Sequence, residues 1–220
     1  MSVVLQGFDT MLTQHIVVYS EGGSHEEVIR AAAGASVISY LKTKESHHGV
    51  WENWLSGPFT KIVRRARTKK EFERIANEIP GWSFFTCDDL EKGGATAFGT
   101  IPLENTAIPK ILSRTQIANF DRERRGFDAW DYSYTKIPGN YIVAINPDVE
   151  MSTGKTAAQV AHAEFAYYLK YGKWLWEIPR YSYDKELFSK LSQEKDVIKI
   201  NDAGRTEIAP GTLTVIAKRL

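Results

Sequence analysis

A stretch in the C-terminal half of the chain, TGKTAAQVAHAEFAYYLKYG at residues 153–172, carries polar residues at spacings that suit a reaction site. Lys155, Gln159 and His162 are four and three positions apart, which stacks them on one face of a helix. The lysine lies near the expected helix start, where unpaired backbone N–H groups attract anions. A histidine exchanges a proton near neutral pH. These residue types indicate acid–base chemistry near an anion, although an ordinary solvated helix face would show the same spacing.

A phosphate-binding loop is the other interpretation of this stretch. Gly154-Lys155-Thr156 matches the end of the motif found in nucleotide hydrolases, but the motif also needs a glycine five residues earlier. That position holds Val149. The sequence therefore argues against a nucleotide hydrolase.

The residues around this polar face predict the element that carries it. Residues 156–171 contain several alanines and no proline, which favours a helix. An apolar stripe of that helix, expected to face a core, recurs at three- and four-residue intervals and consists of Ala158, Ala161, Phe165 and Tyr168. Downstream, residues 196–220 predict a strand, a turn at 202–204, a second turn at Pro210-Gly211 and a closing strand.

The two segments together resemble a known family. The helix start GKTAAQVAHA, preceded by the strand NYIVAIN and followed by DAGRTEIAPGT, is similar to type 2 peptidyl-tRNA hydrolases over residues 140–220. The resemblance implies an α/β fold in which a small mixed sheet is flanked by helices, and chains that pair as dimers. It also implies hydrolysis of the ester between a peptide and the 3′ ribose of tRNA, with peptidyl-tRNA as the partner and neither metal nor cofactor required.

The resemblance also implies particular site residues. The positions that match catalytic residues of the family are Lys155, His162, Asp202 and Thr206, and those expected to bind substrate are Gly154, Gln159, Arg205, Thr212 and Thr214. We expect His162 with Asp202 to orient or deprotonate a water molecule. Lys155 would serve a phosphate or the oxyanion, and Thr206 would position the reactants. Asp202 could instead do no more than hold the histidine tautomer.

An internal repeat is suggested by comparing the two ends of the chain. Residues 14–41 follow the same order of strand, loop and alanine-rich helix as residues 140–169. A shift of 128 positions places Glu27 opposite Lys155, Ala31 opposite Gln159 and Gly34 opposite His162, and a second comparison places Gly99-Thr100 opposite Gly211-Thr212. The first copy would keep the scaffold and lose the chemistry, because glycine cannot act as a base.

The predicted architecture is therefore α/β with two similar lobes, each a small mixed β-sheet flanked by helices. Residues 1–104 would form a degenerate lobe, 105–139 a linker packing on the lobes, and 140–220 the catalytic lobe. The two lobes would imitate a dimer within one chain. The sequence stops at Leu220, where relatives continue with a further helix and strand, so we expect the sheet of the second lobe to need cover at its edge.

Composition limits the remaining possibilities. Lys and Arg number 28 against 27 Asp and Glu, so the net charge of +1 gives no general attraction to nucleic acid or membrane. The single cysteine excludes an intrachain disulfide, the N-terminus lacks the pattern of a secretory signal, and no apolar stretch approaches the ~20 residues of a membrane span. We expect a cytoplasmic protein. The adjacent His47 and His48 have no companions at metal-ligand spacing, so no metal is expected.

Two alternatives stay open. A basic run, with Arg64, Arg65, Arg67, Lys69 and Lys70, fits both a grip on the tRNA backbone and an ordinary solvated surface. The whole chain fits both an active hydrolase and an inactive module that binds tRNA or a protein without turnover.

Overall fold

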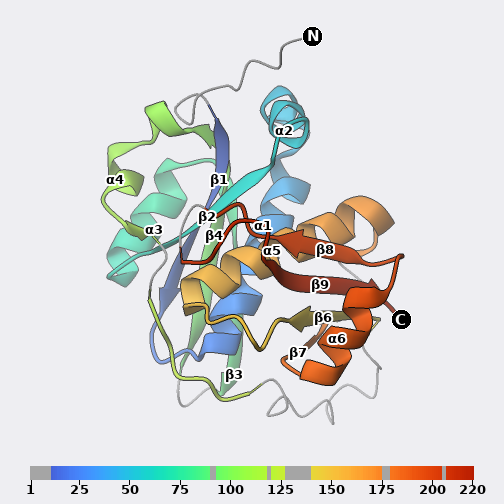
Figure 1. Cartoon of the computed structure of the whole chain (residues 1–220). Helices are drawn as coiled ribbons and strands as arrows, with labels where there is room; N and C mark the ends of the chain where they lie inside the picture. Colours follow the sequence, from blue (N-terminus) through green and yellow to red (C-terminus); the bar gives the residue numbers. More distant parts are fainter. Residues whose placement is uncertain (1–10, 90–92, 118–119, 127–139, 175–178, 205–206) are drawn as a thin grey trace.

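The fold was obtained as a computed structural model, which describes residues 11–89, 93–117, 120–126, 140–174, 179–204 and 207–220. Two separate β-sheets form two lobes, with helices between and outside them (Figure 1). Among the described residues no helix is long and apolar enough to cross a membrane.

The first lobe is built on a five-stranded sheet in the order β3-β4-β1-β2-β5. Its strands are β1 (Leu12–Ser20), β2 (Thr60–Arg65), β3 (Gly81–Asp89), β4 (Gly93–Glu104) and β5 (Gln116–Ile117). Its helices are α1 (His25–Thr43), α2 (His48–Leu55), α3 (Lys69–Glu78) and α4 (Lys110–Ser113), with a 3-10 turn at Asn105–Ala107. β1 runs parallel to β2 and antiparallel to β4, so the sheet is mixed.

The second lobe repeats this plan in a smaller form. Its four strands, in the order β7-β6-β9-β8, are β6 (Tyr141–Ile145), β7 (Pro179–Ser182), β8 (Ile198–Asn201) and β9 (Leu213–Arg219). Its helices are α5 (Thr153–Tyr171) and α6 (Lys185–Gln193). β6 is parallel to β7 and antiparallel to β9, as β1 is to β2 and β4. The two sheets thus share strand order and strand direction, and the first lobe adds α2, α4 and β5.

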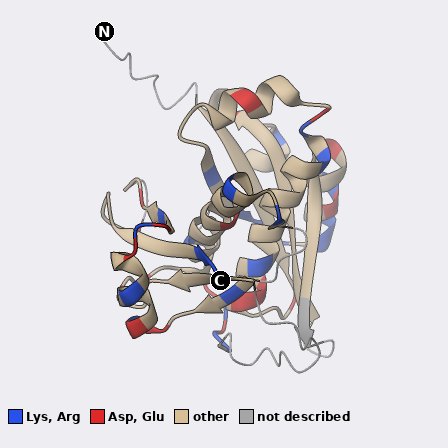
Figure 2. Ribbon diagram, turned by 90° about the vertical axis from the view of Figure 1, so that its right-hand side faces the viewer, with Lys and Arg blue, Asp and Glu red and all other residues tan. Residues whose placement is uncertain are grey.

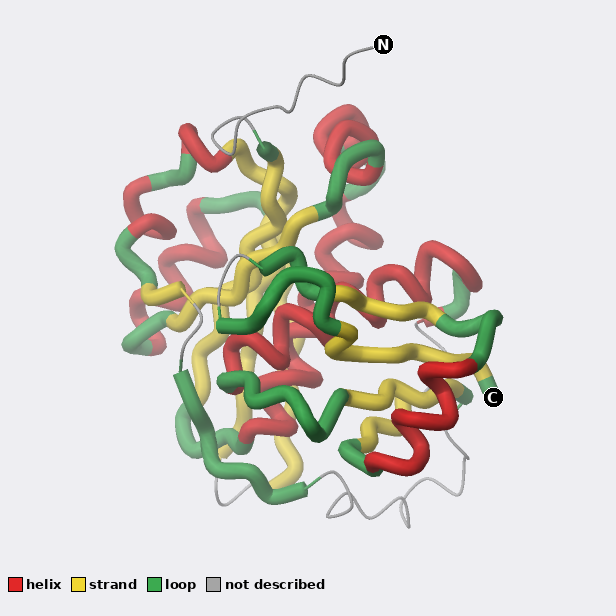
Figure 3. The backbone as a smooth tube through the Cα atoms, in the orientation of Figure 1, coloured by secondary structure: helices red, strands yellow, loops and turns green. Residues whose placement is uncertain are grey.

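The two long helices lie side by side between the sheets (Figures 1 and 3). Both contain 19 residues and both begin after a serine N-cap, Ser24 for α1 and Ser152 for α5, each of which accepts a backbone N–H of the first turn. This N-cap bond satisfies one of the donors left open at a helix start. The predicted helix over residues 156–171 is confirmed and begins three residues earlier.

Alternation along the strands assigns each face of a sheet to a helix. In β1, Ile16 and Val18 pack in the cluster that contains both α1 and α5, whereas Val17 packs with α3. In β6, Val143 packs on the same central cluster, whereas Ala144 packs with α6. Because successive side chains of a strand point to opposite faces, each sheet has one face on the central helix pair and the other on an outer helix.

One part of the predicted repeat is wrong, as the strand pairing shows. Gly99 and Thr100 lie inside β4, where they pair with Ile16 and Gly81. Gly211 and Thr212 instead form the turn that precedes β9. The proposed match of the two Gly-Thr pairs is therefore wrong, because a shared dipeptide does not fix strand register, whereas the buried face does.

The segment after β4 contacts both lobes. β5 pairs with the edge strand β2 and extends the first sheet. Residues 120–126, the loop at the lower left of Figure 3, then cross the N-terminal ends of both central helices. The rest of the predicted linker, at 118–119 and 127–139, lies outside the described residues, as does the N-terminus before residue 11.

Candidate active site

The first element of the candidate site is a buried ion pair. Lys155 Nζ lies 2.5 Å from Asp202 Oδ2, and the two side chains are 8% and 3% exposed. The lysine comes from the first turn of α5, and the aspartate comes directly after β8. The predicted contact between the helix and the closing turn is present. A pair at this depth is screened little by solvent, so the two side chains hold each other firmly in place.

Two further side chains extend this pair into a network. Gln159 Nε2 donates to Asp202 Oδ2 at 2.7 Å, and Thr214 Oγ1 donates to Gln159 Oε1 at 2.8 Å. Because the Asp202 carboxylate only accepts hydrogen bonds, the amide nitrogen of Gln159 must face it, which leaves the amide oxygen to accept from Thr214. The solvated-face interpretation of the helix stripe is therefore wrong for Lys155 and Gln159, which are both buried.

The turn after β8 fixes the Asp202 carboxylate. Asp202 Oδ1 accepts the N–H of Gly204 at 2.7 Å, and the backbone of Asp202 bonds to Thr212 and Gly211. Gly204 has φ +72°, and a Cβ there would lie 2.6 Å from Pro210, so only glycine fits. The turns at Asp202-Ala203-Gly204 and Pro210-Gly211 thus hold the carboxylate in one orientation.

His162 lies apart from this carboxylate. Within the described part of the chain Asp202 bonds to Lys155, Gln159 and Gly204, and His162 is not among its partners. The imidazole instead packs against Phe59 of the first lobe, with ring centroids 5.6 Å apart. Burial, together with the charges of Lys61 and Lys155, lowers the pKa of His162 well below its ordinary value. The ring is therefore neutral at neutral pH.

A pocket of about 490 Å³ joins these groups, and both lobes form its walls. α5 contributes Lys155, Ala158, Gln159 and His162, and β8 with the turn after it contributes residues 199–203. The opposite wall comes from residues 58–63 and Ile117 of the first lobe. The volume falls within the usual range of about 300–1,000 Å³ for small-molecule sites. The site is thus a cleft between the lobes.

The residues on the first-lobe wall belong to no motif of the sequence. Lys61 is 6% exposed, and its Nζ donates to Gln14 Oε1 at 3.0 Å. It lies two positions before the core residue Val63 in β2, so both side chains point to the inner face of the sheet. A lysine that alternates with buried apolar residues along a strand is the pattern that could have identified Lys61 from the sequence.

The N-terminal end of α5 differs from the expected anion site. The N–H of Gly154 donates to Phe120 O at 3.3 Å, and the N–H of Thr153 donates to Asp121 Oδ1 at 3.1 Å. The Ser152 hydroxyl accepts from Lys155 N–H. These donors are already bonded within the protein, so Gly154 has no free N–H for a substrate.

Lys155 occupies a position where helices usually prefer an acid. In α1 the equivalent residue, Glu27, completes a capping box by accepting the N–H of Ser24 at 2.7 Å. A lysine at that place in α5 opposes the positive end of the helix dipole. Residues that break a local rule in this way mark functional sites more often than ordinary surface.

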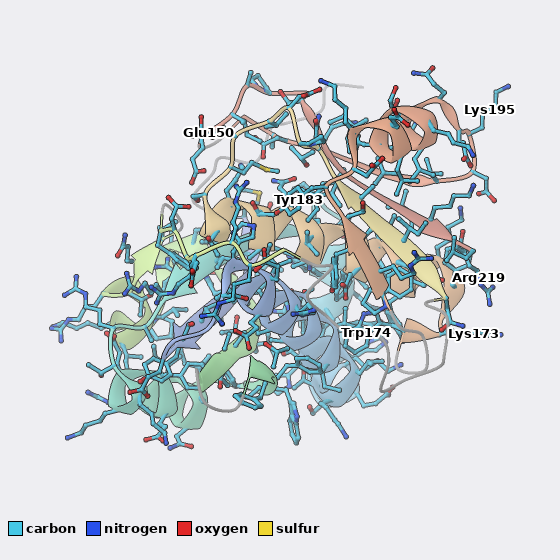
Figure 4. All side chains as sticks on the ribbon, turned by 90° about the horizontal axis from the view of Figure 1, so that it is seen from below. Glu150, Lys173, Trp174, Tyr183, Lys195 and Arg219 are labelled. Carbon is cyan, nitrogen blue, oxygen red and sulfur yellow. The ribbon has the colours of Figure 1, made fainter. Side chains whose placement is uncertain are left out.

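The equivalent face of α1 is filled by protein. A Cβ on Gly34, the counterpart of His162, would lie 2.5 Å from the ring of Phe84. Phe84 in turn packs on Trp174 of the second lobe, with centroids 6.2 Å apart, and Figure 4 shows where this tryptophan lies. At the end of the helix, Arg125 lies 3.9 Å from Glu27.

The remaining predicted positions fall into two groups. Arg205 and Thr206 lie outside the described residues. Thr212 lies in the turn before β9, where its hydroxyl donates to Ala209 O at 2.8 Å, so it supports the turn that holds Asp202.

In the basic run, Arg64 is buried and donates to His15 Nδ1 at 3.0 Å, so it belongs to the core of the first lobe. Basic and acidic residues are interspersed along both lobes (Figure 2).

Comparisons with known proteins place the C-terminal part in a family. The family described as Peptidyl-tRNA hydrolase PTH2 matches residues 140–201, which include the α5 site residues and end just before Asp202. The chain is 33% identical over 92 residues to the peptidyl-tRNA hydrolase of Staphylothermus marinus, an alignment that covers 34% of this chain and 76% of that protein. It is 34% identical over 92 residues to the peptidyl-tRNA hydrolase of Metallosphaera sedula, covering 33% and 79%. No solved structure matches the chain significantly.

The part of the chain that the family matches is thus a mixed α/β lobe whose helix carries the lysine of the buried lysine–aspartate pair. The chain belongs to the peptidyl-tRNA hydrolase PTH2 family through its second lobe. The predicted resemblance is confirmed at this level.

Proposed function

We propose that this protein hydrolyses the ester between a peptide, or an N-blocked amino acid, and the 3′ ribose of tRNA. The observation that carries the proposal is the buried network of Lys155, Asp202, Gln159 and Thr214 at one end of a pocket that also contains His162. Its relatives from Staphylothermus and Metallosphaera carry the name of this activity. Translation supplies such substrates, so we place the protein in the cytoplasm.

In the proposed first step, water attacks the ester carbonyl carbon. His162 is neutral and lines the pocket, so it can accept the proton that the water loses. A carbon–oxygen bond forms, and negative charge develops on the former carbonyl oxygen. Lys155 is placed to stabilise this oxyanion from its fixed position beside Asp202.

In the second step, the bond to the ribose 3′ oxygen breaks. The imidazolium of His162 returns its proton to that oxygen, which leaves a free 3′ hydroxyl on tRNA and a peptide carboxylic acid that ionises in water. Asp202 acts through Lys155 and Gln159 and does not itself take a proton. Thr206 retains the positioning role and Arg205 the substrate contact that the resemblance assigned to them.

We also propose that the two lobes arose as tandem copies and pair within one chain as a dimer would. The shared strand order, the shared strand directions and the equal lengths of α1 and α5 support this. The first copy, residues 1–104, would then be the degenerate one, because its pocket face is filled by Phe84. One active site per chain follows.

Release of N-blocked amino acid from N-blocked aminoacyl-tRNA by the purified chain tests the activity. We expect multiple turnovers without added metal or cofactor. The His162→Asn and Asp202→Asn variants, prepared in the same way, would show that a contaminating hydrolase is not responsible. Absence of release, under conditions where a homologous hydrolase works, would favour the inactive tRNA-binding module instead.

A further inference from the structure

Lys61 is a buried cation in the pocket wall, contributed by the first lobe. Its Nζ lies 3.9 Å from the ring centroid of Phe165 and 4.2 Å from that of Trp54, and it donates one hydrogen bond to Gln14 Oε1. Aromatic faces and a neutral amide attract an ammonium group, but they do not neutralise its charge. Burial lowers the pKa of Lys61 well below its ordinary value.

This cation has no carboxylate partner within the described part of the chain. Among the described residues it contacts the neutral groups of Gln14, Trp54, Phe59 and Phe165, whereas the other buried lysine of the pocket, Lys155, is paired with Asp202. Burying an unpaired charge is costly, which is why burial disfavours the charged form of Lys61, and an anion that enters the pocket beside it stabilises that form. A second anion would bind Lys155 with a smaller gain in free energy, because Asp202 already neutralises its charge. Of these two lysines, Lys61 is therefore the better phosphate ligand.

We propose that Lys61, supplied by the first lobe, binds a phosphate group at the 3′ end of the substrate. This inference rests on the proposed function and moves the phosphate role from Lys155 to the opposite wall of the pocket. The terminal nucleotide of tRNA carries the ester on its ribose and a phosphate on its 5′ oxygen. A ligand of that size suits a pocket of about 490 Å³.

The assignment gives the first lobe a part in substrate binding although its own helix lacks the site residues. Phe59 stands beside Lys61 on the same wall, where its ring meets His162. The lobe therefore faces the substrate from the side opposite the Lys155–Asp202 pair. Lys61 would then bind the phosphate and Lys155 would stabilise the oxyanion, so the two lysines have separate roles.

Calorimetric binding of 5′-AMP and adenosine to the full chain tests the phosphate contact. The two ligands differ only in the phosphate, so their affinity ratio isolates its contribution. We expect wild type to bind 5′-AMP about tenfold or more tightly than adenosine, the scale of a hydrogen bond to a charged group, and Lys61→Met to remove that ratio. Removing an unpaired buried charge should leave the thermal midpoint unchanged or raised, so the variant is expected to fold.

Lys69→Met is the matched control, because Lys69 is exposed on the outer helix α3 and pairs with Glu73. It should keep the wild-type ratio. An equal ratio in wild type and Lys61→Met, or no preference for 5′-AMP in wild type, would overturn the proposal. So would a Lys61→Met defect confined to N-acetylglycine, whose carboxylate mimics the peptide product.

The hydrolysis assay separates this proposal from the proposed function. With N-blocked aminoacyl-tRNA, we expect Lys61→Met to raise KM about tenfold with a smaller change in kcat, as for loss of a ground-state contact. Hydrolysis with no Lys61-dependent phosphate preference would defeat the phosphate site alone. A Lys61-dependent preference without hydrolysis would support the phosphate site and defeat the proposed function alone.

Discussion

His25 Nδ1 lies 2.8 Å from Thr153 Oγ1, and these two residues are the first of α1 and α5, 128 positions apart. The same separation in sequence relates Tyr40 to Tyr168, whose ring centroids are 5.8 Å apart near the other end of the helices. Because counterparts meet near both ends, α1 and α5 pack in parallel and in register, which supports the proposed pairing of two copies within one chain.

The pH dependence of turnover should report the state of His162. Its lowered pKa means that the neutral ring persists as pH falls through the ordinary histidine value of 6.5. We expect kcat/KM to stay level from neutral pH downward and to decline only at a more acidic pH. A profile with its acid midpoint at or above 6.5 would show that His162 is not the proton acceptor in this environment.

Replacing His162 with Asn should reduce turnover by about 10²-fold or more, the usual scale for a positioned acid–base group. Circular dichroism would verify folding. Glu27→Ala is the control on the equivalent first-lobe helix: it should lose about 1 kcal/mol of stability through its capping box and little activity. A large activity loss from Glu27→Ala would show that the active site does not lie in the second lobe alone.

The Lys155–Asp202 pair should behave as a unit in urea unfolding. Either Lys155→Met or Asp202→Asn leaves a buried group without its partner, at a cost of about 3–5 kcal/mol in the free energy of unfolding. The double variant should lose less than the sum of the two. The exposed pair Lys170–Asp196 is the control, since its removal should change stability little. Additive losses at Lys155 and Asp202 would refute the coupling.

Glu164 should make stability depend on pH. Burial raises the pKa of its carboxyl from 4.5 to about 7, against the opposing effect of hydrogen bonds from Tyr181 and Trp174. The folded state therefore holds a proton that the unfolded state releases. The contribution of Glu164 to the free energy of unfolding is fully present below about pH 4.5 and is lost as pH rises through 7. The loss amounts to about 3 kcal/mol. Glu164→Gln should flatten the curve of unfolding free energy between pH 5 and 8, a range of about 3 pH units.

The second lobe should not fold alone. α5 packs against α1 and β2 of the first lobe, and Phe165 lies in a cluster with Trp51 and Trp54. A fragment of residues 140–220 would expose these apolar surfaces, so we expect it to unfold or self-associate. Analytical ultracentrifugation with thermal unfolding measures both. A monomeric fragment with a cooperative transition would contradict this expectation.

The sequence allowed much of the second lobe to be predicted, because its signals are local. Alanine content, the serine cap and the DAG and PG turns specify α5, β8 and β9, and the spacing of Lys155 and Gln159 places both on the face that meets Asp202. Spacing along one helix could not show which residue reaches the carboxylate. The structure pairs Asp202 with Lys155 and Gln159 rather than with His162.

The remaining features depend on contacts between distant segments. α5 is buried on more sides than its apolar stripe indicates, because α1 covers a second face. The closed helix start depends on Phe120 and Asp121, which no pattern near residue 153 reveals. Lys61 lines the pocket only because the first lobe packs against the second. These are tertiary relationships, and single-sequence periodicity does not encode them.

The ring of Phe84 against Gly34 has a consequence for how such a protein can change over generations. In an assembly of two identical chains, every substitution is made twice, so a ring that blocks one cleft blocks the other and activity is lost. Here the two central helices belong to one polypeptide, and a mutation in the codon for residue 84 leaves the opposite cleft untouched. One half can therefore drift toward a purely supporting role while selection continues to act on the other.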